Sequence, residues 1–187
     1  MKQKFAMFIR VISIPPLMVT YLLTLLYFFH EGVFADAGEF IAALTFLAII
    51  PALAYPVAAI VPKLRAGGRP TQRKAAFVAS VIGYIGGFIY GAATRISKPV
   101  LTILSAYLIS LLMLVLFNKV IKIRASGHAC SAAGPLLFLI YYFGWWMLLP
   151  SILVGWLVAW ASVTLRRHTP TDLLWGALCS AAGFVIA

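Results

Sequence analysis

Long apolar runs recur along the chain, and only short polar segments separate them. Hydrophobic residues make up 64 % of the 187 residues and charged residues only 10 %, too little charge to cover the surface of a water-soluble domain. Inside a bilayer each backbone polar group must be bonded within the protein, so the runs predict helices. We therefore expect an all-α fold, a polytopic membrane bundle of six to seven transmembrane helices. The predicted spans cover about 11–29, 40–61, 75–94, 99–117, 129–148, 151–165 and 170–187.

A single integral membrane domain is expected over the whole chain, with an N-terminal helical pair in 1–61 and a core in 62–187. The first ten residues are basic and mildly amphipathic, which favours a position at the membrane interface. A cleaved signal peptide is not expected, because the first apolar run contains Pro15-Pro16 and no small-residue cleavage site. Several runs are shorter than the roughly 20 residues of a full crossing, so one is expected to be tilted, partial or re-entrant.

Two features inside the spans indicate packing. Gly83, Gly87 and Gly91 recur at four-residue intervals, a spacing that lets another helix approach closely. Cys130 and Cys179 lie in apolar sequence without metal-ligand spacing, so both are interpreted as packing residues.

Two polar islands interrupt the second half of the chain. Residues 166–172 contain two arginines, a histidine and an aspartate, and residues 124–128 contain a second histidine. Ionisable groups among apolar spans are costly, so both islands are candidate functional sites. Two predicted spans separate the basic segment 62–74 from 124–128, and two more separate 124–128 from 166–172. All three segments are therefore expected on one face of the membrane, where they can converge.

Each island also has a purely structural interpretation. Ser126-Gly127-His128 precedes a predicted helix, whose free backbone amides form a natural phosphate cradle, but Ser126 could equally serve as the helix cap. Thr169-Pro170-Thr171-Asp172 is typical of a capped helix start. Asp172 could also accept a hydrogen bond from His168, four residues back.

The formal net charge of +11 indicates a membrane partner more than a nucleic acid, because the basic residues fall in short segments between spans. The face of the islands carries most of them, namely Lys2, Lys4, Arg10, Lys63, Arg65, Arg69, Arg73, Lys74, Lys119, Lys122, Arg124, Arg166 and Arg167. The opposite face has Arg95 and Lys98 together with the acidic residues of its loops. The positive-inside rule then predicts a cytoplasmic site.

Taken together, the motifs resemble the type 2 phosphatidic acid phosphatase superfamily, membrane lipid phosphate phosphatases related to vanadium haloperoxidases. That family shows Lys-x6-Arg-Pro, then Pro-Ser-Gly-His, then Ser-Arg-x5-His-x3-Asp. Ala125-Ser126-Gly127-His128 matches the second motif except for its proline, and His168-x3-Asp172 matches the end of the third. Lys63 is followed after five residues by Arg69-Pro70, one short of the first motif.

The third motif departs from the family at its arginine. Ser162 stands where that arginine is expected, six residues before His168. Arg166 or Arg167 is a candidate to supply the missing charge from another backbone position. The likeness extends from about residue 63 to the end of the chain, and the first two spans carry none of it.

The resemblance implies a metal-independent enzyme without cofactors. His168 would attack phosphorus to form a phosphohistidine, Asp172 would orient its imidazole, and His128 would protonate the leaving oxygen and later activate water. The phosphoryl oxygens would be bound by Lys63, Arg69, Ser126, Gly127 and one of Arg166 or Arg167.

The implied substrate is a phosphorylated membrane lipid, such as phosphatidic acid, phosphatidylglycerol phosphate or a polyprenyl diphosphate. The compact chain resembles small prokaryotic members, which predicts a location in the inner or cell membrane. Two alternatives stay open: a lipid phosphotransferase on the same scaffold, and a non-catalytic lipid-binding membrane protein.

Overall fold

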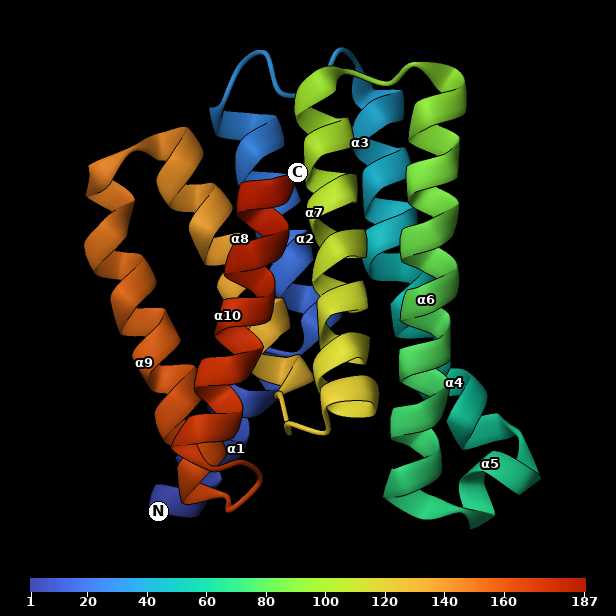
Figure 1. Ribbon diagram of the computed structural model, residues 1–187, viewed down its shortest axis with the longest axis vertical. Helices are drawn as coiled ribbons and strands as arrows, with labels where there is room; N and C mark the ends of the chain where they lie inside the picture. The colour runs from blue at the N-terminus through green and yellow to red at the C-terminus, as the bar shows by residue number, and fades with distance from the viewer.

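The computed structural model describes the backbone of residues 1–187 and every side chain except that of Arg69, and the fold is all-α (Figure 1). The helices are α1 (Lys2–Ile12), α2 (Pro15–Phe29), α3 (Ala37–Leu44), α4 (Ile50–Ile60), α5 (Pro62–Ala66), α6 (Gly68–Thr94), α7 (Lys98–Val115), α8 (Gly127–Phe143), α9 (Leu148–Thr164) and α10 (Pro170–Ile186). Wider helical turns, η1 (Thr45–Ile49) and η2 (Leu116–Ile121), join α3 to α4 and extend α7. A short 3-10 turn, η3 (Trp145–Met147), precedes α9.

The prediction of an all-α fold is confirmed, and several helices are long and apolar enough to span a membrane, but fewer than the six to seven predicted. Among the described residues, four stretches are long and apolar enough to cross a membrane: Ala37–Ile60, Pro70–Thr94, Lys98–Ile121 and Trp145–Thr164. A fifth is added if α1 and α2 count as one bent span. The apolar helices α8 and α10 have only 17 residues each, below the length of about 20 that a straight crossing needs.

The first predicted span, expected from residue 11, is broken near its start: α1 ends at Ile12 and α2 begins at Pro15. The axes of α1 and α2 differ by 57°. Ile14 has the extended backbone expected before a proline, with φ −63° and ψ 150°, and this residue ends the helical path. Helix α1 instead packs along α9, where Ala6 and Ile9 are buried against Ala161.

The basic segment 62–74 is helical, whereas the sequence predicted a loop. Helix α5 covers its first part, and α6 begins at Gly68, seven residues before the predicted start at 75. Pro70 does not prevent this, because it lies in the first turn, where a missing N–H breaks no helical hydrogen bond. Arg73 and Lys74 therefore project from α6.

The glycine spacing in α6 allows close packing, as predicted. A Cβ atom added at Gly87 would lie 2.9 Å from Phe46 Cβ and 3.1 Å from a Leu104 methyl group. Gly83 faces the Phe46 carbonyl, and Gly91 faces Leu104 and Ile96. These contacts hold α6 against η1 and α7.

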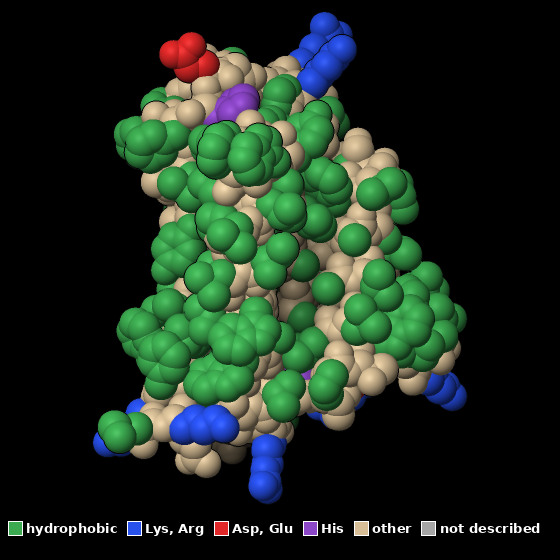
Figure 2. All heavy atoms as spheres, turned by 90° about the vertical axis from the view of Figure 1, so that its left-hand side faces the viewer, with side chains coloured by type: hydrophobic (Ala, Val, Ile, Leu, Met, Phe, Trp, Pro, Cys, Tyr) green, Lys and Arg blue, Asp and Glu red, His purple; other side chains and the backbone are tan. Residues whose placement is uncertain are grey.

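The two ends of the bundle differ in charge. The N-terminus, α5 and the connections that lead into α8 and α10 lie at one end, and the α2–α3 and α6–α7 connections lie at the other (Figure 1). Lys and Arg side chains gather at the first end, and the second shows acidic side chains together with a basic one, with an apolar belt between the two ends (Figure 2). The three polar segments thus share one end.

Candidate functional site

The α9–α10 connection presents His168 immediately before a helix start. Helix α9 ends at Thr164, and Arg166 takes a left-handed backbone with φ 51° to reverse the chain. Thr169 then caps α10: its side chain accepts from the Asp172 N–H at 3.2 Å, and the Thr169 N–H donates to Asp172 Oδ2 at 3.1 Å. This capping box fixes the backbone on both sides of the imidazole.

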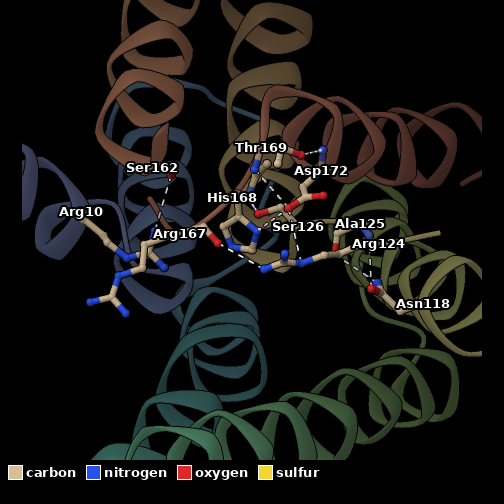
Figure 3. A network of polar contacts seen from close by, with 11 residues as sticks. Arg10, Asn118, Arg124, Ala125, Ser126, Ser162, Arg167, His168, Thr169 and Asp172 are labelled. Atoms are coloured by element: carbon tan, nitrogen blue, oxygen red, sulfur yellow. Dashed lines mark hydrogen bonds and ion pairs between the residues drawn. The ribbon is translucent and has the colours of Figure 1, made fainter. Parts of the chain in front are cut away.

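Asp172 also contacts His168. Its Oδ2 atom lies 3.5 Å from His168 Nδ1, and both side chains are only 9 % exposed. The same carboxylate oxygen lies 3.4 Å from Arg124 Nε (Figure 3). Both interpretations of Asp172 are therefore compatible, because one carboxylate caps the helix and faces the imidazole.

The protonation of His168 is set by its surroundings. Burial lowers the pKa of His168 below its ordinary value, and the charges of Arg10 and Arg124 lower this pKa further, while Asp172 opposes them. The imidazole is therefore held in the neutral form, which has a free lone pair.

His128 lies in the first turn of α8. The Ser126 side chain accepts from the Ala129 N–H and caps this helix, and the Ser126 N–H donates to the Asp172 carbonyl at 2.8 Å. This bond ties the start of α8 directly to the start of α10. The ring nitrogen Nε2 of His128 lies 3.1 Å from Ser13 Oγ in the α1–α2 connection.

A cavity of about 910 Å³ connects the two histidines. Both line it, although they come from different islands. Its lining at this end includes the cationic side chains Arg10, Arg73, Lys74, Lys119 and Arg167, together with Gly127 at the start of α8. Apolar residues of α6, α7, α8 and α10 line the remainder. The volume is that of a typical small-molecule site.

The other predicted phosphate ligands are placed less favourably. The Ser126 hydroxyl is fully buried as the α8 cap and does not line the cavity. Lys63 is exposed on α5 and Arg166 is exposed on the reversed turn, and neither lines the cavity. The Arg69 side chain lies outside the described part of the structure. Of the predicted phosphate ligands whose cationic side chains are described, Arg167 lines the cavity, and its buried Nε has no hydrogen-bond partner among the described atoms.

Arg10 is a site residue that the sequence did not reveal. It comes from α1, lines the cavity, and its Nη1 atom donates to Ser162 Oγ at 3.5 Å (Figure 3). Its charge acts on both His128 and His168. Ser162, which is fully buried, is the position where the family motif has arginine.

Among the described side chains no group of three or more His, Cys, Asp or Glu residues could hold a metal ion. Comparison with protein-family models, with curated proteins and with solved structures finds no match to this chain. Its site must therefore be interpreted from its own geometry.

Proposed function

We propose that this protein is a membrane lipid phosphate phosphatase that acts through a phosphohistidine. The observation that carries the proposal is the shared cavity, where His128 and His168 stand together with Arg10, Arg167 and Lys74. Guanidinium and ammonium groups neutralise the charge of a phosphoryl group, and imidazoles can donate and accept the protons that its transfer requires.

In the first step His168 attacks phosphorus. Contact of Nδ1 with Asp172 leaves Nε2 as the nucleophilic atom and stabilises the positive ring that forms. A P–N bond forms, the P–O bond to the lipid breaks, and His128 gives its proton to the leaving lipid oxygen. Burial and, after it, the neighbouring Arg10 charge disfavour the protonated form of His128, and a bound phosphate dianion opposes both.

In the second step water attacks the phosphohistidine. His128, now neutral, takes a proton from this water, the P–N bond breaks, and orthophosphate leaves. Both steps build negative charge on the phosphoryl oxygens. Arg167, Arg10, Lys74 and the free backbone amides at the start of α8 lie on the cavity wall to neutralise it.

Arg10 takes over the role of the family arginine in this proposal. Its guanidinium reaches Ser162 from a different helix, so the charge is present although the backbone position has moved. Arg166 and Arg167 were the candidates from sequence, and of these Arg167 alone lines the cavity.

A lipid substrate follows from the shape of the cavity, which continues from the cationic end into apolar helix surfaces. Such a site can bind the phosphate at the membrane surface while the tail remains among the helices. With α8 and α10 as short crossings, the chain passes the membrane seven times, within the predicted six to seven. From the positive-inside rule we infer a site on the cytoplasmic side. The resemblance to small prokaryotic members implies a prokaryotic cell membrane.

Orthophosphate release from a detergent-solubilised lipid phosphate tests the proposal. His168→Ala is expected to lower kcat at least about 10³-fold, and His128→Ala by about 10²–10⁴-fold, the usual contribution of a general acid–base. His30→Ala is the matched control, because this third histidine lies in the connection after α2 at the opposite end of the bundle. It is expected to retain activity.

Two other results would contradict the hydrolase. Phosphate that appears only on an added alcohol acceptor indicates the phosphotransferase. Lipid binding without turnover, unchanged in His168→Ala, indicates a non-catalytic lipid-binding protein. Acid-labile, base-stable phosphate trapped on the wild type and absent from His168→Ala would support the phosphohistidine intermediate.

A further inference from the structure

The cavity extends well beyond the two histidines. Tyr107 of α7 lines it, and so do Tyr84 of α6 and Ser180 of α10. Tyr107 is separated by 11 positions (107 to 118) from Asn118, whose side chain bonds the Ala125 backbone beside the site. This part of the cavity therefore lies within the apolar span Lys98–Ile121, away from the basic end of the bundle.

This inner end contains an unpaired polar group. The Tyr107 hydroxyl is buried and has no hydrogen-bond partner among the described atoms, and the residue is 7 % exposed. Its ring meets Tyr84 edge to face, with centroids 5.5 Å apart, so the neighbouring aromatic surface does not satisfy the hydroxyl. Buried hydroxyl groups almost always have a partner, and one that lines a cavity is available to a ligand.

Other polar side chains accompany this hydroxyl. Ser110 and Ser180 are buried, 8 % and 3 % exposed, and both line the same cavity from α7 and α10. Ser180 has a partner in the Cys130 thiol, and Ser110 Oγ faces Gly183 of α10, so neither is an unpaired group. The Tyr107 hydroxyl lacks a partner among the described atoms, and its burial is costly unless a ligand supplies one.

We propose that Tyr107 is a substrate-binding residue, whose hydroxyl bonds an oxygen carried on the tail of the lipid phosphate. The inference rests on the proposed function, since it takes the phosphate to occupy the histidine end. The substrate class is then a phosphate ester whose chain has a hydroxyl or carbonyl group where it passes Tyr107 among the helices. Polyprenyl phosphates and diphosphates, whose tails contain no oxygen, lack this group.

A pair of substrates tests this directly: a long-chain alkyl phosphate and its analogue with a hydroxyl group in mid-chain. The wild type is expected to show kcat/KM roughly five- to tenfold higher for the hydroxylated lipid, the usual value of one hydrogen bond. Tyr107→Phe is expected to abolish this preference, so that kcat/KM becomes equal for the two lipids. Tyr90→Phe, an exposed tyrosine of α6 outside the cavity, is the matched control and should keep the preference.

Binding of the corresponding non-hydrolysable alkyl phosphonates gives the same comparison without turnover. Equal affinity for the plain and hydroxylated phosphonates, or a preference that survives Tyr107→Phe, would overturn the role of Tyr107. Failure of the wild type to release orthophosphate from either lipid would instead overturn the proposed hydrolase, and the phosphonate measurement would still decide the binding site.

Discussion

Arg10 shows how one side chain can serve a site from a distant part of the chain. Its partner Ser162 lies 152 positions away, at a distance of 3.5 Å from Nη1 to Oγ. Arginine is suited to this role, since its long side chain delivers a permanently charged, planar group to an oxyanion. A serine at position 162 leaves space for that group, whereas an arginine there would compete for it.

The first prediction concerns moving the guanidinium group from position 10 to position 162. Arg10→Ala is expected to lower kcat/KM for a lipid phosphate by about 10²–10³-fold, the cost of one transition-state charge partner. Ser162→Arg in the Arg10→Ala background is expected to restore a large part of the activity, because the new guanidinium starts from the residue that Arg10 now contacts. Steady-state kinetics of the single and double variants measure both effects.

Lys4→Ala provides the control, as it removes a cation from the exposed face of the same helix. Full activity of Arg10→Ala would eliminate Arg10 from the site. Ser162→Arg alone is expected to lower activity, because it places two guanidinium groups at one position.

The acidic limb of the pH profile is the second prediction. Neutral His168 is the nucleophile, and its pKa is lowered by burial and by Arg10 and Arg124. Activity is therefore retained below about pH 6.5, the ordinary histidine value, and is lost only as the pH falls through the lower pKa. Arg124→Ala removes a positive charge, raises the His168 pKa, and should move the acidic limb of kcat/KM to higher pH.

Lys122→Ala, in the same connection but without contact to Asp172, should leave that limb in place. A limb that Arg124→Ala does not move, or moves to lower pH, would show that a group other than His168 controls it. Each profile is measured with one substrate, so that the ionisation of the phosphate itself cancels between variants.

Sequence alone identified the residues that stand out chemically. His128, His168 and Asp172 are ionisable groups among apolar spans, so they could be singled out without coordinates. Arg10 and Ser13 could not, because a basic amphipathic segment looks the same whether its cations bind headgroups or reach a cavity. Ser126 was ambiguous because helix capping and phosphate binding would use the same hydroxyl. In the structure this hydroxyl accepts from the Ala129 N–H and so caps α8.

At the scale of helices, the site depends on how closely α10 crosses the start of α8. A Cβ atom added at Gly176 would clash with the Ser126 carbonyl oxygen and would lie 3.1 Å from Ala129 Cβ. Backbone cannot move aside as a side chain can, so only glycine permits this approach. The bond from Ser126 N–H to the Asp172 carbonyl depends on the same contact.

Gly176→Ala is therefore expected to destabilise the protein by about 1–3 kcal/mol through overpacking, although alanine is the better helix former. Gly155→Ala in α9 is the matched control, since its Cβ would lie an ordinary 3.7 Å from a Leu136 methyl group. This control is expected to be neutral or stabilising. Thermal unfolding in detergent compares the two, and equal midpoints would contradict the close crossing.

Helix boundaries were predictable only where a local signal marks them. Thr169-Pro170 gave the start of α10, and the structure has the predicted capping box there. The start of α6 was missed by seven residues, because the glycines, proline and basic residues of 67–74 suggest a loop, although Pro70 lies in the first turn, where it breaks no helical hydrogen bond. The sequence also predicted full spans for α8 and α10, whereas each has only 17 residues. A helix that is packed among its neighbours can be shorter than a full span.

At the scale of the whole molecule, charge is divided between the two ends. Lys and Arg side chains gather at the end that contains the site, and the other shows acidic side chains together with a basic one (Figure 2). A phosphate site attracts cations by itself, but it does not account for Lys2 and Lys4, which are exposed on α1. Their position therefore supports orientation by the positive-inside rule independently of the site.

Single cysteines in intact cells test this orientation. Arg65→Cys places a thiol on exposed α5 at the site end, and Glu31→Cys places one in the exposed connection at the opposite end. Both native cysteines, Cys130 and Cys179, are buried, which keeps their background reaction low. A membrane-impermeant maleimide is expected to label Glu31→Cys in intact cells and Arg65→Cys only after permeabilisation. The reverse pattern would place the phosphate site outside the cytoplasm, and labelling of both in intact cells would contradict an odd number of crossings between the two ends.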